Sequence, residues 1–166
     1  PTAHLVCEIN PAAASIAVSE ARKYTDRPRF VAGSIGPTAL SASLPTDVKI
    51  PAVRAVSFDT LAEAYSEQST ALIEGGVDFL LIETIFDLLN AKAAAEGARR
   101  AMETTGVTIP LVFSFTISDT SGRILSGHTP EAILATMAPY NPAALGFNSS
   151  AGPQTLTVHA RALATI

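Results

Sequence analysis

The sequence predicts an α/β fold in which short strands alternate with helices along the whole chain. Four short, nearly continuous apolar runs occur at residues 29–34, 78–83, 110–116 and 143–148. Such runs are typical of strands that are covered on both faces of a sheet. Helical patterns precede the first run, separate the runs and follow the last one. This alternation predicts a parallel sheet with right-handed crossovers.

Two architectures share this pattern. The later strands are expected to start near residues 78, 110 and 143, a spacing that fits βα units of roughly 30 residues or more. A complete (β/α)₈ barrel needs about 250 residues, so four units in 166 residues correspond to half a barrel. A doubly wound open sheet accommodates the same four units. The spacing alone leaves both architectures open.

Helix boundaries are expected where capping residues flank the periodic segments. Asn10 is an expected N-cap, with Pro11 as the first helical residue. Thr60 stands three residues before Glu63, which is the spacing of a capping box. Gly106 is expected to end the third helix, and Thr129 is expected to cap the fourth, with Pro130 as its first helical residue. The five expected helices cover residues 10–25, 60–74, 87–105, 130–138 and 153–165.

The connection at residues 36–57 is unusually long and contains three prolines. Loops of this length inside compact domains are often functional. Two interpretations follow: the loop covers a substrate, or it is a plain surface excursion.

Composition and charge exclude several classes of protein. A hydrophobic content of 48% and a charged content of 16% argue against disorder. Lys and Arg total 11 against 15 Asp and Glu, so we expect no nucleic-acid partner. No basic leader and no run of 18 apolar residues occurs, so we expect no signal peptide, no membrane partner and a cytoplasmic location. The single cysteine, Cys7, is expected to be a buried structural thiol.

Polar side chains gather at or just past the ends of the expected strands. They are Ser34, Glu83, Thr84, Ser114, Thr116 and Asn148, with Ser149 and Ser150 directly after Asn148. Ligands bind at this edge of parallel α/β folds, because loops and helix N-termini converge there. We therefore expect the site to lie at the carboxyl ends of the strands.

Glu83 is the sharpest of these residues, because a carboxylate that ends a buried apolar strand needs a partner. In one interpretation it anchors a cationic group, such as the ammonium of a substrate. In the other it makes a helix N-cap contact or an ion pair with a residue on a neighbouring strand.

Four longer segments carry a more specific pattern. They are RFVAGSIGPT (29–38), SFDTLAEAYSEQSTALIEGGVDFLLIETIFDLLNAKAA (57–94), FSFTISDTSGRILSGHTPEA (113–132) and ALGFNSSAGP (144–153). In this order they resemble the homocysteine-binding domain of cobalamin-dependent methionine synthases, within the homocysteine S-methyltransferase family. The resemblance covers essentially the whole chain. It implies a TIM-type (β/α)₈ barrel of which residues 1–166 form a single partial domain with about strands three to six.

The resemblance also implies a chemistry. The family binds homocysteine and activates its thiol with a zinc ion held by three cysteine thiolates. The methyl group comes from methylcobalamin on a separate module, and a folate-binding module accompanies it. The family carboxylate that matches Glu83 holds the substrate amino group. Ser34, Thr116 and Asn148 are expected to line the same pocket.

This sequence departs from the family pattern at the zinc site. Ser149 stands where the family has a zinc-ligand cysteine, and the family's cysteine pair is absent from the chain. We therefore expect that the chain alone binds no zinc in the family manner and is inactive. The alternative is a non-catalytic small-molecule-binding domain that has lost the zinc site. Half a barrel leaves two unpaired strand edges and one sheet face insufficiently covered, so self-association is also expected.

Overall fold

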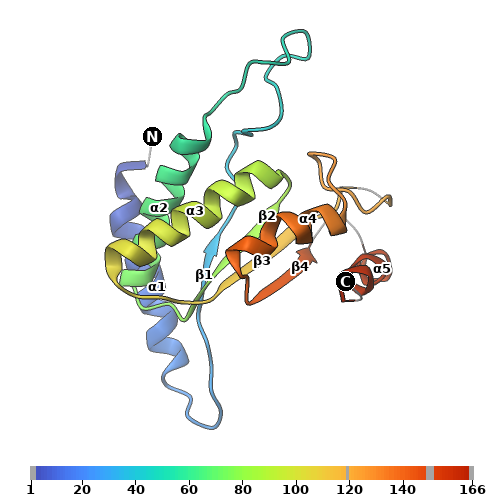
Figure 1. The fold of residues 1–166 in the computed structure, drawn as a ribbon. Helices are drawn as coiled ribbons and strands as arrows, with labels where there is room; N and C mark the ends of the chain where they lie inside the picture. Colours follow the sequence, from blue (N-terminus) through green and yellow to red (C-terminus); the bar gives the residue numbers. More distant parts are fainter. Residues whose placement is uncertain (1–2, 119, 149–151, 165–166) are drawn as a thin grey trace.

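The chain folds into alternating helices and parallel strands (Figure 1). The computed structural model describes residues 3–118, 120–148 and 152–164. In chain order the elements are η1 (Ala3–Leu5), α1 (Val6–Ala21), β1 (Ala32–Ile35), α2 (Phe58–Glu74), β2 (Phe79–Ile85), α3 (Leu88–Thr105), β3 (Leu111–Thr116), α4 (Pro130–Met137), η2 (Ala138–Tyr140), β4 (Ala144–Asn148) and α5 (Pro153–Ala164). The α/β prediction is confirmed. No helix in the described ranges is both long enough and apolar enough to cross a membrane.

The four strands form one sheet in the order β1-β2-β3-β4, and each neighbouring pair is parallel. Spatial order therefore follows chain order without a reversal. A doubly wound sheet reverses its strand order at a switch point, so the described strands favour the barrel-like alternative.

The helices bury only one face of this sheet, which we call the helix face. Side chains that point to it are fully buried, among them Ile35, Leu80, Ile82, Phe113 and Phe115 at 0% exposure. On the opposite face, which we call the open face, the side chains at alternate positions are half-buried or exposed: Ser34, Phe79, Leu81, Glu83, Val112, Ser114 and Thr116. The expectation that both faces are covered is therefore wrong for the described residues. Apolar side chains occur on the open face as well, and they made the runs look continuous.

All four strands begin later than predicted, and β1 and β2 also end later. Residues 29–31 lie before β1, although the apolar run begins there. The backbone N–H of Val31 donates to Asp78 Oδ2 at 2.6 Å, so a side chain replaces a strand partner at this point. Asp78 in turn precedes β2 rather than belonging to it.

Two expected helix starts are also wrong. Helix α1 begins at Val6 and ends at Ala21, so Pro11 lies inside it and Asn10 is not its N-cap. Proline lacks the N–H that would donate to the carbonyl four residues earlier. The side chain of Asn10 adds a hydrogen bond in the same part of the helix, since its Nδ2 donates to the Val6 carbonyl at 2.9 Å. Helix α2 is capped by Ser57, whose Oγ accepts from the Thr60 N–H at 3.1 Å. Thr60 therefore lies in the first turn of α2.

The remaining capping predictions are confirmed. Thr129 caps α4 with Pro130 in the first turn, and its Oγ1 accepts from the Ala132 N–H at 3.3 Å. Gly106 ends α3 with a φ of +70°, a left-handed conformation in which a residue without Cβ is unstrained.

Helices α2 and α3 pack at very short range around Gly97. A Cβ added there would lie 2.7 Å from the backbone oxygen of Ala62 and 2.7 Å from the backbone nitrogen of Ser66. The side of α3 that packs inward consists mainly of alanines with 0% exposure: Ala91, Ala93, Ala94, Ala95, Ala98 and Ala101. Small side chains thus allow the two backbones to approach. The N-terminus of α3 lies beside the end of β2, because only two residues separate the two elements.

Replacement of Gly97 by alanine is expected to lower the free energy of unfolding by about 1–3 kcal/mol, because the added methyl group overlaps backbone atoms of α2. Helix propensity alone predicts the opposite sign, about 1 kcal/mol in favour of alanine. Chemical denaturation measures the difference. Gly146→Ala is the matched control, since a Cβ at Gly146 meets no atom within 4 Å. Equal stability of the two variants would contradict the close packing.

Candidate functional site at the carboxyl edge of the sheet

The first polar pair of the site joins β1 to β2. Ser34 Oγ donates to Glu83 Oε1 at 2.7 Å, and both side chains lie on the open face. Glu83 is partly exposed, whereas Leu80 and Ile82 before it are fully buried. β2 therefore runs from the core to an accessible edge of the sheet and places the Glu83 carboxylate at that edge.

The second group joins β2, β3 and β4 through one amide. Thr116 Oγ1 donates to Asn148 Oδ1 at 2.9 Å, and Asn148 Nδ2 donates to Thr84 Oγ1 at 3.2 Å. The four residues predicted from strand ends, Ser34, Glu83, Thr116 and Asn148, are thus brought to one edge. Ser149 lies outside the described residues.

A local irregularity in β2 separates these two groups. Ile82 is paired with Phe113, and Ile85 is paired with Phe115. Three steps along β2 therefore match two steps along β3, which defines a β-bulge. Thr84 lies inside it with a φ of +60°.

Asp87, a residue that the sequence analysis did not select, is almost fully buried just after β2. Its Oδ1 accepts from the N–H groups of Leu89 and Asn90 at 2.9 and 3.4 Å, so it caps α3. Its Oδ2 accepts from the Ser41 hydroxyl and from the Ser43 N–H at 3.1 Å. One carboxylate thereby fixes both a helix and the long loop.

Asn90 adds a second connection to the same loop. Its Oδ1 accepts from the Ala42 N–H at 2.9 Å, and its Nδ2 donates to the Leu40 carbonyl at 2.8 Å. Asn90 is 2% exposed. The base of the loop at residues 36–57 is therefore held by the first turn of α3.

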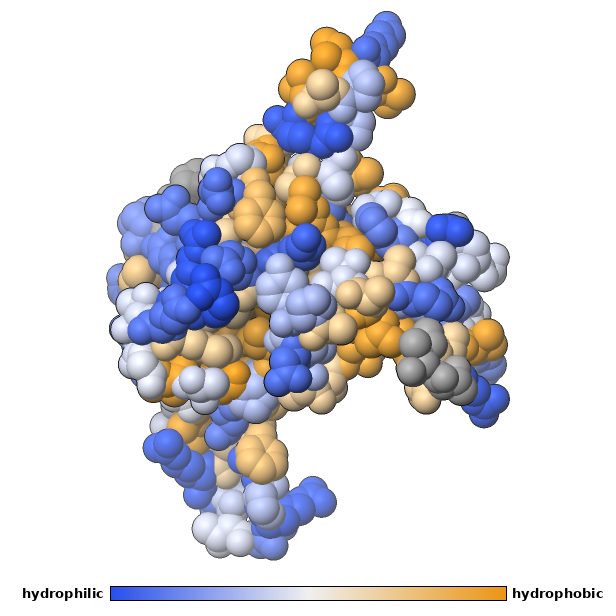
Figure 2. All heavy atoms as spheres, in the orientation of Figure 1, coloured by the Kyte–Doolittle hydropathy of each residue, from blue (hydrophilic) through white to orange (hydrophobic). Residues whose placement is uncertain are grey.

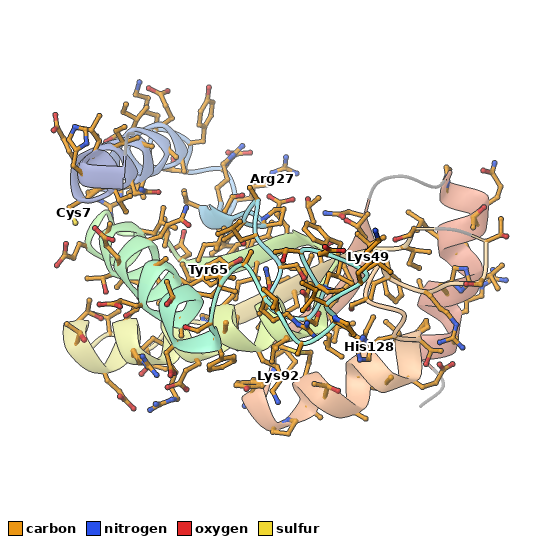
Figure 3. All side chains as sticks on the ribbon, turned by 90° about the horizontal axis from the view of Figure 1, so that it is seen from above. Cys7, Arg27, Lys49, Tyr65, Lys92 and His128 are labelled. Atoms are coloured by element: carbon orange, nitrogen blue, oxygen red, sulfur yellow. The ribbon has the colours of Figure 1, made fainter. Side chains whose placement is uncertain are left out.

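Beyond this base the loop projects from the carboxyl edge of the sheet (Figure 1). Hydrophobic side chains gather on the projecting part (Figure 2), where Val48, Ile50 and Val53 are 88%, 53% and 48% exposed. In the view from above, the segment with Lys49 lies over the strands (Figure 3). The base of the loop is thus fixed at the same edge of the sheet as the site, and the covering of a substrate by the projecting part stays a prediction.

A second connection reaches the same helix end from β3. The Ser126 N–H donates to the Phe86 carbonyl at 3.1 Å, and Ser126 Oγ accepts from the Leu88 N–H at 3.3 Å. His128, which is labelled in Figure 3, has its Nδ1 3.0 Å from Ser126 Oγ. The region between β2 and α3 therefore anchors both loops at this edge.

Two opposing effects act on the pKa of Asp87. Burial raises it, because the charged form loses hydration, whereas hydrogen bonds from Ser41, Ser43 and Leu89 lower it. The hydrogen bonds dominate, and the pKa lies below the ordinary range of an aspartate. Asp87 is therefore charged when it holds the loop at neutral pH.

The expectation for Cys7 is wrong. The side chain is exposed on α1, and its thiol donates to Glu67 Oε1 at 3.5 Å. Its pKa is raised, chiefly because the thiol is hydrogen-bonded to Glu67. In the described part of the chain, no three His, Cys, Asp or Glu side chains are grouped as a metal site would require.

Comparison with known proteins gives the family. A model of homocysteine S-methyltransferases matches residues 2–166. The chain belongs to this family. Its fold is similar to that of the homocysteine methyltransferase MmuM from Escherichia coli in the apo form, with a TM-score of 0.64 and 21% sequence identity. The match covers 95% of this chain and 53% of that one, so the chain spans about half the length of this relative.

Replacement of Asp87 by asparagine is expected to lower the free energy of unfolding at pH 7 by about 1.5–3 kcal/mol, because hydrogen bonds to a charged acceptor are lost. A carboxylate with a lowered folded-state pKa stabilises above its unfolded pKa, and this contribution disappears as the pH falls through the folded value. When the pH is lowered from 7 to below about 4, the unaltered chain should therefore lose more unfolding free energy than the Asp87→Asn variant does.

Chemical denaturation between about pH 3 and pH 7 measures both effects. Asp59→Asn is the matched control, since Asp59 is exposed in the first turn of α2. If both substitutions changed the stability and its pH dependence equally, the network around Asp87 would not be the cause.

Proposed function

We propose that this chain binds the amino-acid end of homocysteine within a methionine synthase, which transfers a methyl group from methylcobalamin to the homocysteine sulfur. The observation that supports this proposal most directly is the position of Glu83. Its carboxylate accepts a hydrogen bond from Ser34 at the accessible carboxyl edge of the sheet. The family match supports homocysteine as the methyl acceptor.

Neither the N-cap contact nor an ion pair is found for Glu83 among the described residues, although its carboxylate accepts a hydrogen bond from Ser34 on β1. Asp87, and not Glu83, caps α3. Among the described residues, the ion pairs within 4 Å join other carboxylates, those of Glu20, Asp26, Glu96 and Glu103, to Lys or Arg. Glu83 is therefore available to a cationic group from outside, such as the ammonium of an amino acid.

The reaction requires that the homocysteine thiol loses its proton, since a free thiol has a pKa near 8.5. The sulfur then forms a bond to the methyl carbon, while the bond between that carbon and the donor breaks and its electron pair stays with the donor. Zinc would supply a Lewis acid that holds the sulfur as thiolate. The described residues do not fit that ion, and we derive no step through it. Their task in this proposal is to bind and orient the amino-acid end.

The wider proposal follows the family resemblance of the sequence. The four βα units are about strands three to six of an eight-stranded barrel in the cytoplasm, and cobalamin-carrying and folate-binding modules are its partners. The β1 and β4 edges have no strand partner among the described residues, which supports self-association of the chain alone. Ser149 favours a second candidate, a small-molecule-binding domain without methyl transfer.

Replacement of Glu83 by glutamine is expected to weaken homocysteine binding about 10- to 150-fold in the full-length protein. A charge-assisted hydrogen bond contributes roughly 1.5–3 kcal/mol, and about 1.4 kcal/mol corresponds to a factor of ten. Calorimetric titration measures the affinity, and a melting curve measures the stability of the same variant.

Two controls make this test specific. Glu63→Gln changes an exposed carboxylate on α2 and should leave the affinity unchanged. 4-Mercaptobutanoate lacks the amino group of homocysteine, so its binding should be insensitive to Glu83→Gln. A lower melting temperature with unchanged homocysteine affinity would assign Glu83 a structural role instead.

The purified chain is expected to contain less than one equivalent of zinc by elemental analysis, also with homocysteine present. Ser149→Cys alone should not restore binding, because one thiolate of three is too few. The same change should raise zinc affinity in a longer protein that carries the cysteine pair. One equivalent of zinc in the unaltered chain would refute this expectation.

A further inference from the structure

We propose that Thr84 is a positioning residue, which sets Glu83 and Asn148 at a defined separation across the site. The inference rests on the proposed function for the identity of the ligand. The structural evidence for this role is the bulge in β2 and the hydrogen bond between Thr84 and Asn148.

Side chains along a strand point alternately to the two faces of a sheet. Ile82 points to the helix face and Glu83 to the open face, so a regular strand would direct Thr84 back toward the helices. The extra residue between Ile82 and Ile85 changes this alternation. Ile85 returns to the helix face with 1% exposure, while Thr84 contacts the open-face residue Asn148. The two consecutive polar side chains of Glu83 and Thr84 therefore lie at the same edge of the sheet.

The backbone of Thr84 is in an unfavourable region for its residue type. A φ of +60° is a clear outlier for a β-branched side chain, and positions of this kind are usually occupied by glycine. Such strain persists only where the surroundings over-determine the conformation, and it gathers at functional sites. The residue at this position supplies something that glycine would lack, namely a hydroxyl group.

That hydroxyl accepts a hydrogen bond from Asn148 Nδ2 at 3.2 Å. Thr116 donates to the other end of the same amide at 2.9 Å, so the Asn148 side chain is held from β2 and β3 together. Thr84 is also covalently joined to Glu83, the proposed ammonium anchor. One residue thus couples the anchor to the last described residue of β4.

Thr84→Val removes the hydroxyl but keeps the branched shape. We expect homocysteine affinity to fall about three- to tenfold in the full-length protein, as for the loss of one neutral hydrogen bond. Thr84→Ser restores the acceptor and should recover most of the affinity. Thr104→Val, on the exposed side of α3, is the matched control and should have no effect.

A ligand-free measurement separates this inference from the proposed function. Selective ¹⁵N labelling of asparagine side chains reports the Asn148 amide directly. Thr84→Val should shift this resonance and speed its proton exchange, whereas Thr84→Ser should not. If the parent bound no homocysteine, the proposed function would fail, and the amide signal would still test the positioning.

Thr84→Gly covers the case in which the valine variant does not fold, because glycine accepts a φ of +60° without strain. It should behave as Thr84→Val does in both measurements. The inference is overturned if the variants without the hydroxyl leave the Asn148 signal unchanged, or if they bind homocysteine as tightly as the parent does.

Discussion

The helices cover only one face of the sheet, and this one-sided packing decides where each side chain of the site can lie. Every second residue of a strand is committed to the helix face, where Leu80, Ile82, Phe113 and Phe115 are fully buried. The other positions remain accessible to polar residues without the cost of burying them. Ser34, Glu83 and Thr116 use these positions where the strands end. The site thus follows from the alternation of side chains in a sheet with one covered face.

Much of this arrangement could be predicted from the sequence. The polar residues at the ends of the apolar runs mark the carboxyl edge, because parallel strands all end on the same side. The parallel direction of the strands followed from repeated βα units, and Gly106 and Thr129 marked helix boundaries by their conformational and capping properties. These features depend on local chemistry, which a sequence displays directly.

Other features depend on tertiary contacts and were missed. Nothing local in the segment around Thr84 indicates a left-handed backbone, since a threonine is among the residues least suited to it. The partners of Asp87 lie more than forty positions earlier in the chain, so only its capping of α3 has a local signal, the N-cap position before Leu88. The apolar runs themselves did not indicate the open face, because Phe79, Leu81 and Val112 make both faces of the strands look apolar.

The base of the long loop after β1 is held by hydrogen bonds from residues at the start of α3. Asp87 and Asn90 hold residues 40–43, and Ser57 begins the next helix. Between these two fixed ends, changes in loop length alter the closure entropy only slowly. Natural variation can therefore lengthen, shorten or rewrite the projecting segment while Glu83 and its neighbours stay in place. The fold thus separates the polar residues at the strand ends from a segment whose length and sequence can change independently of them.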